Sequence, residues 1–409
     1  MSSSAFGWYA VDPAQRRRMM EAVDQLRDRT TVDDLGIGGI RDSFSDSLFP
    51  GTSTLHTRLR YVLFVPWLMQ ASTHRDTARQ MQLTFRDLEY KFIDALQRGG
   101  EAQGVFGRQS GRNLTRLPSV VYWGGIVSWG LVERGMQVHD VFERSVLRRE
   151  EQKRQPPTED SESRPELTPT GIDSGLPHPP ADLHRSATFA LRREDAEYLS
   201  EAISRSQPDS LLAHLLTHRP ATWTSAASAP ETVWDPRIRE QLPERLAGLV
   251  SRAEKFSFSM LGASLLYNLL VAEEAAGGNK TDDETVQLYR ERLDTWSDDA
   301  RHAPSVTQTE RLEIWEMVWG MNRRLNSSTQ GFLSTWFDSA HSTRVVADDP
   351  ALRDLVRGRE RQVKGSLARL GNRRALDAWG GASGAGRLEF RWRYARSHLQ
   401  DIYDGLEAA

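Results

Sequence analysis

The spacing of apolar residues along the chain predicts a mainly α, multi-helix fold. Three series of apolar residues recur every three or four positions, and each marks one face of a helix: Phe85, Leu88, Phe92 and Leu96; Val286, Tyr289, Leu293 and Trp296; Leu312, Trp315 and Trp319. Strict alternation of apolar and polar residues, the pattern of a half-buried strand, is scarce. Short strands are expected only near residues 130–141.

The segment 256–276 is apolar on nearly all sides, which predicts a buried central helix. Asn268 lies inside this segment. A buried amide side chain needs hydrogen-bond partners, so Asn268 is expected to find them within the core.

A change of composition divides the chain into two helical regions. Residues 149–185 are dominated by Pro, Ser, Glu and Asp and contain few large apolar residues. Such a segment buries too little apolar surface to offset its ordering entropy. We therefore expect a disordered linker or long loop there, between an N-terminal region (1–148) and a C-terminal region (186–409).

Residues 84–140 fit a helix-turn-helix-like or winged-helix-like unit. After the helix 84–98, Ser119 can cap a second helix that turns Val120 to the core and ends at Gly130, and a short strand can follow. In such units the second helix enters the major groove of DNA. Three arginines would flank it: Arg108, Arg112 and Arg116. The alternative is a helical hairpin inside a core.

The turn that begins at Pro50 predicts an anion site. Thr52, Ser53 or Thr54 can cap a following helix, whose free backbone N–H groups favour a phosphate. Arg58 and Arg60 add positive charge nearby. The alternative is an ordinary capped helix whose arginines pair with acidic residues upstream.

Charge is distributed unevenly along the chain, although the net charge is only -3. The segment 353–396, the Arg-rich segment, has twelve basic and four acidic residues, or about +8, whereas 282–316 has ten acids and four arginines, or about -6. On a helical wheel four cations of the Arg-rich segment form one stripe beside an apolar face: Arg353, Arg357, Arg361 and Lys364. Arg359 falls inside the apolar arc.

The Arg-rich segment is thus a candidate contact for a nucleic-acid backbone. Arg391 and Arg393 alternate with Phe390, Trp392 and Tyr394, and such aromatic residues can stack on single-stranded bases. The alternative is that the segment packs on the acidic 282–316 segment and the aromatic side chains belong to the core.

Several motifs together are distinctive: Phe6-Gly7-Trp8; the stretch from Asp34 to Trp67; Leu117-Pro118-Ser119 with Tyr122-Trp123; Met260 to Asn268; and Arg359-Glu360, Lys364-Gly365, Arg369-Leu370 and Trp379. In these motifs the chain resembles an uncharacterised bacterial family, the domain-of-unknown-function family 6361. The resemblance implies no established activity. It implies a setting near helicases and phospholipase-D-like nucleases in mobile or antiviral loci.

No residue pattern identifies catalytic chemistry. Cysteine is absent, which removes disulfides, thiol nucleophiles and Cys-ligated metals. His214 and His218 have the spacing of two zinc ligands, but the glutamate of a zincin motif is missing. The five lysines do not stand in a phosphate-binding glycine loop, and no nucleophile elbow occurs. We expect neither cofactor nor metal, and a cytoplasmic protein without a signal or membrane segment.

These observations favour an accessory or adaptor protein of a bacterial nucleic-acid-processing or antiviral system. It would contact DNA or RNA, or a partner nuclease or helicase, through the Arg-rich segment. The alternative is an enzyme of unrecognised class with a phosphate-handling site near Thr52–Arg60. A third possibility is an assembly subunit whose arginines pair with acidic surfaces.

Overall fold

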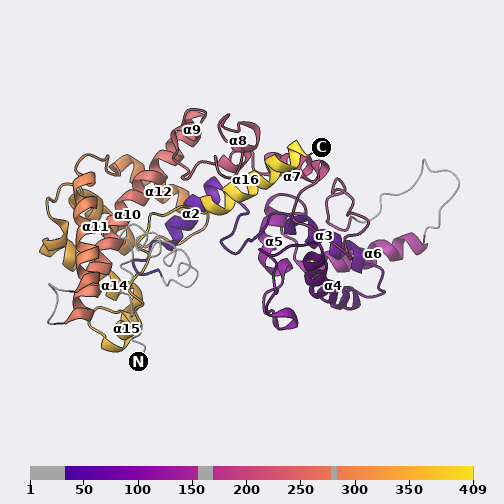
Figure 1. The fold of residues 1–409 in the computed structure, drawn as a ribbon, viewed down its shortest axis with the longest axis horizontal. Helices are drawn as coiled ribbons and strands as arrows, with labels where there is room; N and C mark the ends of the chain where they lie inside the picture. Colours follow the sequence, from indigo (N-terminus) through magenta and orange to yellow (C-terminus); the bar gives the residue numbers. More distant parts are fainter. Residues whose placement is uncertain (1–32, 155–168, 278–282, 409) are drawn as a thin grey trace, which may run out of the picture. The chain divides into compact units, whose positions relative to one another are not determined.

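The computed structural model describes residues 33–154, 169–277 and 283–408, and these residues are mainly α-helical (Figure 1). This confirms the predicted fold class. Within the described residues, β-pairing is limited to an isolated antiparallel bridge between Val132 and Ile172. The strand expected near 130–141 is thus reduced to that bridge.

The chain forms two compact units, each made of segments that are distant in sequence. Unit 1 comprises the residues up to Phe44 and Gly248–Phe390, and unit 2 comprises Ser45–Ala247 and Arg391–Ala409. Helices α2 (Gly38–Leu48) and α10 (Glu244–Ala276) contribute residues to both.

The segment 149–185, expected to be a linker between regions, lies inside unit 2. Residues 149–154 continue helix α6 (Val138–Arg154), and Leu176 and Leu183 are buried. Residues 155–168 lie outside the described residues. A few well-placed leucines thus anchor the end of a segment whose average composition is polar.

Unit 1 is built around α10. The other helices of this unit are α11 (Glu284–Ala300), α12 (Gln308–Gly320), α13 (Ser327–Ser339), α14 (Pro350–Lys364) and α15 (Arg373–Asp377). By length and composition α10 could cross a membrane, but 83% of its most apolar stretch is buried inside the protein, as in a core helix. Asn268 donates to the Ser383 carbonyl (2.7 Å) and accepts from the Ser383 N–H (2.8 Å), as its burial required.

The predicted helix faces of unit 1 are correct for α11 and only partly correct for α12. All four predicted apolar residues of α11 are buried. In α12 the buried residues are Ile314, Trp315 and Val318, whereas Leu312 and Trp319 are 54% and 49% exposed. Helix α12 has apolar residues on two sides, and periodicity alone did not show that the side with Ile314 and Val318 faces the core.

Unit 2 contains α3 (Tyr61–Ser72), α4 (Ala78–Arg98), α5 (Pro118–Ser128), α6, α7 (Arg193–Ser206), α8 (Leu211–Thr217), α9 (Pro236–Arg239) and α16 (Trp392–Glu407). Helix α4 begins with a capping box between Thr77 and Gln80 and buries Phe85, Phe92 and Leu96. It packs on α3, which is buried along most of its length and also contacts α5.

The winged-helix-like arrangement is not confirmed. Helix α5 begins and ends near the expected residues, but residues 99–117 separate it from α4, far more than the three- or four-residue turn of a helix-turn-helix. Ser119 bonds to Glu89 instead of capping the helix. Val120, expected in the core, is 66% exposed, and Tyr122 and Ile126 face the core in its place.

Candidate functional site

The turn at Thr52–Thr54 in unit 2 does not cap a helix, so that prediction is wrong. Residues 52–60 form turns and bends, and α3 begins only at Tyr61, with no side-chain cap. The Thr52 hydroxyl donates to the Phe49 carbonyl (2.6 Å), and the Ser53 hydroxyl accepts from the Leu55 N–H (3.2 Å). Thr54 is exposed. The hydroxyls of Thr52 and Ser53 thus stabilise the turn itself.

The two arginines of this turn bind carboxylates, but the carboxylates come from distant helices instead of upstream residues. Arg60 is buried and pairs with Asp195 of α7 (2.6 Å). It also donates to the Thr188 carbonyl at 3.0 Å. Arg58 lies 3.8 Å from Asp401 of α16. Both arginines therefore fasten the turn to the rest of unit 2.

A buried histidine pair lies beneath the turn. His56 Nδ1 is 3.3 Å from His398 Nε2, and the His56 ring stacks on Tyr122 with 4.2 Å between ring centroids. Burial lowers the pKa of His56 to about 4 and that of His398 well below its usual value. The other ring nitrogens, His56 Nε2 and His398 Nδ1, are also buried and make no hydrogen bond in the described structure. Sequence reasoning missed this pair because 342 positions separate its members.

Two of the predicted phosphate-binding residues, Thr52 and Arg391, lie in contact beside this turn. Arg391 bonds to Asp46 (2.5 Å) and to the Thr52 carbonyl (2.9 Å). Arg393 is exposed.

Trp392 is buried and donates to the Pro230 carbonyl (3.0 Å), so it belongs to the core of unit 2. Phe390 is likewise buried, in unit 1. The expectation that these two rings stack on bases is therefore wrong, and the core alternative holds.

The predicted cationic stripe of α14 divides into two parts. Arg353 binds Glu273 of α10 and donates to the Ala347 carbonyl (2.6 Å), and the Lys364 side chain is 5% exposed and pairs with Asp34. Arg357 is partly exposed, 3.5 Å from Asp354 of the same helix, and Arg361 is exposed. Arg353 and Lys364 are thus structural residues, and neither pairs with the acidic 282–316 segment.

Lys364 belongs to a buried network of charges in unit 1, which we call the Asp34 network. Arg369 Nη1 lies 2.9 Å from Asp34. Glu360, which is fully buried, accepts from the Tyr267 hydroxyl (2.8 Å) and from the backbone N–H groups of Arg369 (2.7 Å) and Leu370 (3.0 Å). The two carboxylates and two cations balance each other, which is the condition for burying charge.

Arg359 extends this network toward the N-terminal loop. Its guanidinium donates to the carbonyls of Leu35 (2.8 Å) and Gly36 (3.3 Å) and to the Thr329 hydroxyl (2.8 Å). Gly36 has φ +67° and lies against this guanidinium, so a side chain there would clash. Arg359, which the helical wheel places inside the apolar arc, is thus buried by binding backbone carbonyls and a hydroxyl.

The exposed cations that remain in this part of unit 1 follow the Asp34 network along the chain. Residues 361–374 hold five cations and no acid. Three are exposed: Arg361, Arg373 and Arg374. Among the described residues Arg361 and Arg374 have no ion-pair partner, whereas Arg373 lies 3.2 Å from the exposed Asp377. We call these three arginines, with Leu367 (74% exposed), the α14–α15 surface.

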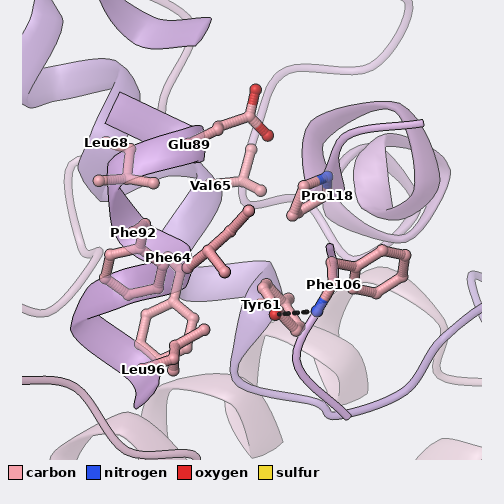
Figure 2. Close-up of a pocket in the computed structure, with 10 residues that line it drawn as sticks. Tyr61, Phe64, Val65, Leu68, Glu89, Phe92, Leu96, Phe106 and Pro118 are labelled. Carbon is pink, nitrogen blue, oxygen red and sulfur yellow. Dashed lines mark hydrogen bonds between the residues drawn. The ribbon is translucent and has the colours of Figure 1, made fainter. Parts of the chain in front are cut away.

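A small cavity in unit 2 is lined mainly by apolar side chains from α3 and α4 (Figure 2). Its volume of about 10 Å³ is close to the minimum for one water molecule. The Tyr61 hydroxyl accepts from the Phe106 N–H at its edge (3.0 Å). The only charged residue that lines it is Glu89, whose pKa is raised by burial to about 7. The cavity is too small for a nucleotide or another organic substrate.

One group of side chains has the composition of a metal site. His139, Asp140 and Glu143, on the first turns of α6, offer ligand atoms within 4.8 Å of one another. Asp140 already accepts from the Gln137 N–H (2.6 Å), and His139 and Glu143 are exposed. The group is therefore explained as the polar start of a helix.

The buried polar residues of unit 1 coincide with the motifs that carry the family resemblance. The Asp34 network, Arg359 and Asn268 bring together three of the five motif groups, and Phe6–Trp8 lies outside the described residues. No curated protein and no solved structure matches the chain. A family comparison matches residues 3–405, and the chain therefore belongs to DUF6361, a family of unknown function.

Proposed function

We propose that this protein is an accessory protein of a nucleic-acid-processing system and that it binds the phosphate backbone of DNA or RNA. The observation that carries the proposal is the α14–α15 surface. There Arg361, Arg373 and Arg374 are exposed within a 14-residue stretch, 361–374, that contains no acidic residue. Exposed arginines favour phosphate because the planar guanidinium bonds two oxygens at once.

The Asp34 network supports the proposal by holding this stretch in place. Lys364 and Arg369 are neutralised by Asp34, and Glu360 binds the backbone at Arg369 and Leu370. The exposed arginines therefore lie on the two helices that an anchored connection joins. A fixed cationic surface loses less conformational entropy on binding than a flexible tail does.

The setting that we infer is an adaptor beside a nuclease or helicase, as in antiviral defence. This part of the proposal depends on the genomic neighbourhood that the family resemblance implies. It agrees with the small size of the Glu89 cavity, which leaves no room there for a substrate.

Salt-dependent binding tests the proposal. The probe is a fluorescent duplex of about 20 base pairs, with the corresponding single-stranded DNA and RNA, measured by anisotropy. Three phosphate contacts predict that affinity for the duplex falls about 40-fold between 50 and 200 mM salt. The triple variant R361E/R373E/R374E should abolish this binding.

A matched triple variant, R301E/R324E/R344E, reverses three exposed arginines elsewhere in unit 1 and should retain most of the affinity. Equal losses in the two triple variants would refute a localised site. So would an absence of binding by the unmodified protein at low salt.

A further inference from the structure

A groove on unit 1 has no role in the proposed phosphate contact. It has a volume of about 840 Å³ and runs along α12 and α13, and we call it the α12 groove. Its lining includes Lys255, Val306, Arg311, Leu312, Trp315 and Phe337. This volume accommodates several side chains of a bound polypeptide, in contrast to the cavity at Glu89.

Folding of the unit leaves part of the apolar surface exposed on the groove side of α12. Ile314 and Val318 attach the helix to the core. Leu312 and Trp315 line the groove, and Trp319 follows on the same side of the helix beyond it, at positions i, i+3 and i+7. Leu312 and Trp319 are about half exposed, whereas Trp315 is buried. Exposed tryptophan and leucine in line are typical of an interaction surface, where tryptophan contributes much of the binding energy.

The charges around this apolar strip are arranged asymmetrically. Lys255 and Arg311 are mostly buried and pair with Glu310 (2.7 Å) and Asp338 (2.6 Å). Asp338, by contrast, is 64% exposed, and Glu313 and Glu316 are exposed on α12. The paired cations keep the pKa values of Glu310 and Asp338 below their usual range, so both carboxylates are charged at neutral pH. The surface thus presents apolar anchors beside negative charges.

We propose that the α12 groove binds an amphipathic helix of a partner protein whose apolar face is flanked by Lys or Arg. The linear i, i+3, i+7 arrangement fits the apolar stripe of a second helix, as in other helix-in-groove complexes. The exposed carboxylates select basic flanks on that helix. The site does not rest on the proposed nucleic-acid contact and uses different residues.

Two model helices of equal leucine content test the proposal with the full chain. One peptide carries lysine at its polar positions and the other carries glutamate, and each has a fluorophore for anisotropy. The Leu/Lys peptide should bind, and the Leu/Glu peptide should bind at least tenfold more weakly. Leu312→Lys should weaken Leu/Lys binding at least tenfold because it removes an anchor and adds repulsion.

Leu83→Lys is the matched control, because Leu83 is an equally exposed leucine on α4 in unit 2. It should leave peptide binding unchanged. Trp319→Lys, at the exposed end of the same apolar strip, is a second variant of this surface, in case Leu312→Lys folds poorly. Binding that is insensitive to both Leu312→Lys and Trp319→Lys, or equal for the two peptides, overturns the proposal. Self-association of the peptide-free protein that Leu312→Lys abolishes would also overturn it, and would assign the groove to a second copy. Leu312→Lys should leave DNA affinity unchanged, which separates this outcome from failure of the proposed function.

Discussion

The Asp34 network of unit 1 and the Glu89 and histidine groups of unit 2 bury polar side chains in opposite ways, although unit 2 also contains one balanced buried pair, Arg60 with Asp195. In unit 1 the carboxylates Asp34 and Glu360 are buried with the cations Lys364 and Arg369, so charge is balanced within one network. In unit 2 the buried Glu89 and the buried histidine pair have no counter-charge in direct contact, and burial shifts their pKa values toward the neutral forms.

This difference determines how each unit responds to change. A balanced network fails when one member is removed, because the remaining charge is then buried alone. An unbalanced group that stays neutral costs little until the pH charges it. Unit 1 should therefore be sensitive to substitutions in its network, and unit 2 should be sensitive to pH.

The largest effect is expected for Glu360→Gln. The glutamine keeps one acceptor oxygen, but its amide NH₂ must face a backbone N–H group at Arg369 or Leu370. The substitution also removes the charge that balances the network. We expect a loss of about 3–5 kcal/mol in the free energy of unfolding, measured by urea denaturation.

Asp354→Asn is the control for this prediction. Asp354 is on the same helix and also neighbours a cation, Arg357, but its side chain is largely exposed. Its substitution should change stability by less than about 0.5 kcal/mol. Comparable losses in the two variants would mean that the Asp34 network contributes no more than an exposed pair.

The next effect concerns Glu89. Its folded pKa of about 7 lies above the usual value of 4.5, so the folded state binds the extra proton. Stability from this group is therefore present at low pH and lost as the pH rises from about 4.5 to 7. Glu89→Gln removes the loss and should raise the free energy of unfolding at pH 8 by about 3 kcal/mol relative to the unmodified protein.

The check is urea denaturation at pH 5 and pH 8, with Glu143→Gln, at an exposed position of α6, as the control. A difference that does not vary with pH would contradict the raised pKa.

Several local features could be predicted from the sequence, because each depends on neighbours along the chain. The apolar face of α4 follows from side-chain spacing. The need of Asn268 for partners followed from its place in an apolar helix, although the sequence could not identify Ser383. The family resemblance was confirmed over residues 3–405.

The candidate site was predicted less well. A helical wheel shows in which direction a side chain points, but it does not show which carboxylate approaches that side chain from elsewhere in the chain. Arg353 and Lys364 share the stripe with Arg361, yet Glu273 and Asp34 approach only the first two. The partner of Arg60, Asp195, is 135 positions away. Long-range carboxylates of this kind decide which arginines are free to bind a ligand, and single-sequence patterns do not reveal them.

The smallest expected effect on the free energy of unfolding concerns the histidine pair of unit 2. His56 is held neutral, with a folded pKa of about 4 against a usual 6.5, so below pH 6.5 the unfolded state binds the extra proton. Stability from this group is present above pH 6.5 and is lost as the pH falls toward 4. Between pH 7 and pH 5.5 the loss is about 1 kcal/mol.

His56→Gln should remove this part of the pH dependence, and a His56→Gln/His398→Gln double variant should remove about twice as much. Two cations act on the pair, Arg58 and Arg391, and both oppose its protonation. Asp401, on the same helix as His398, has a pKa that burial raises to about 6. Asp401 and Glu89 give a slope of opposite sign, but they are present in every protein compared and largely cancel in the difference. The measurement is therefore the difference between unmodified and variant stabilities at pH 7 and pH 5.5. If that difference is the same at both pH values, the histidines are already protonated or exposed in the folded protein. The contrast between the two units would then rest on Glu89 alone.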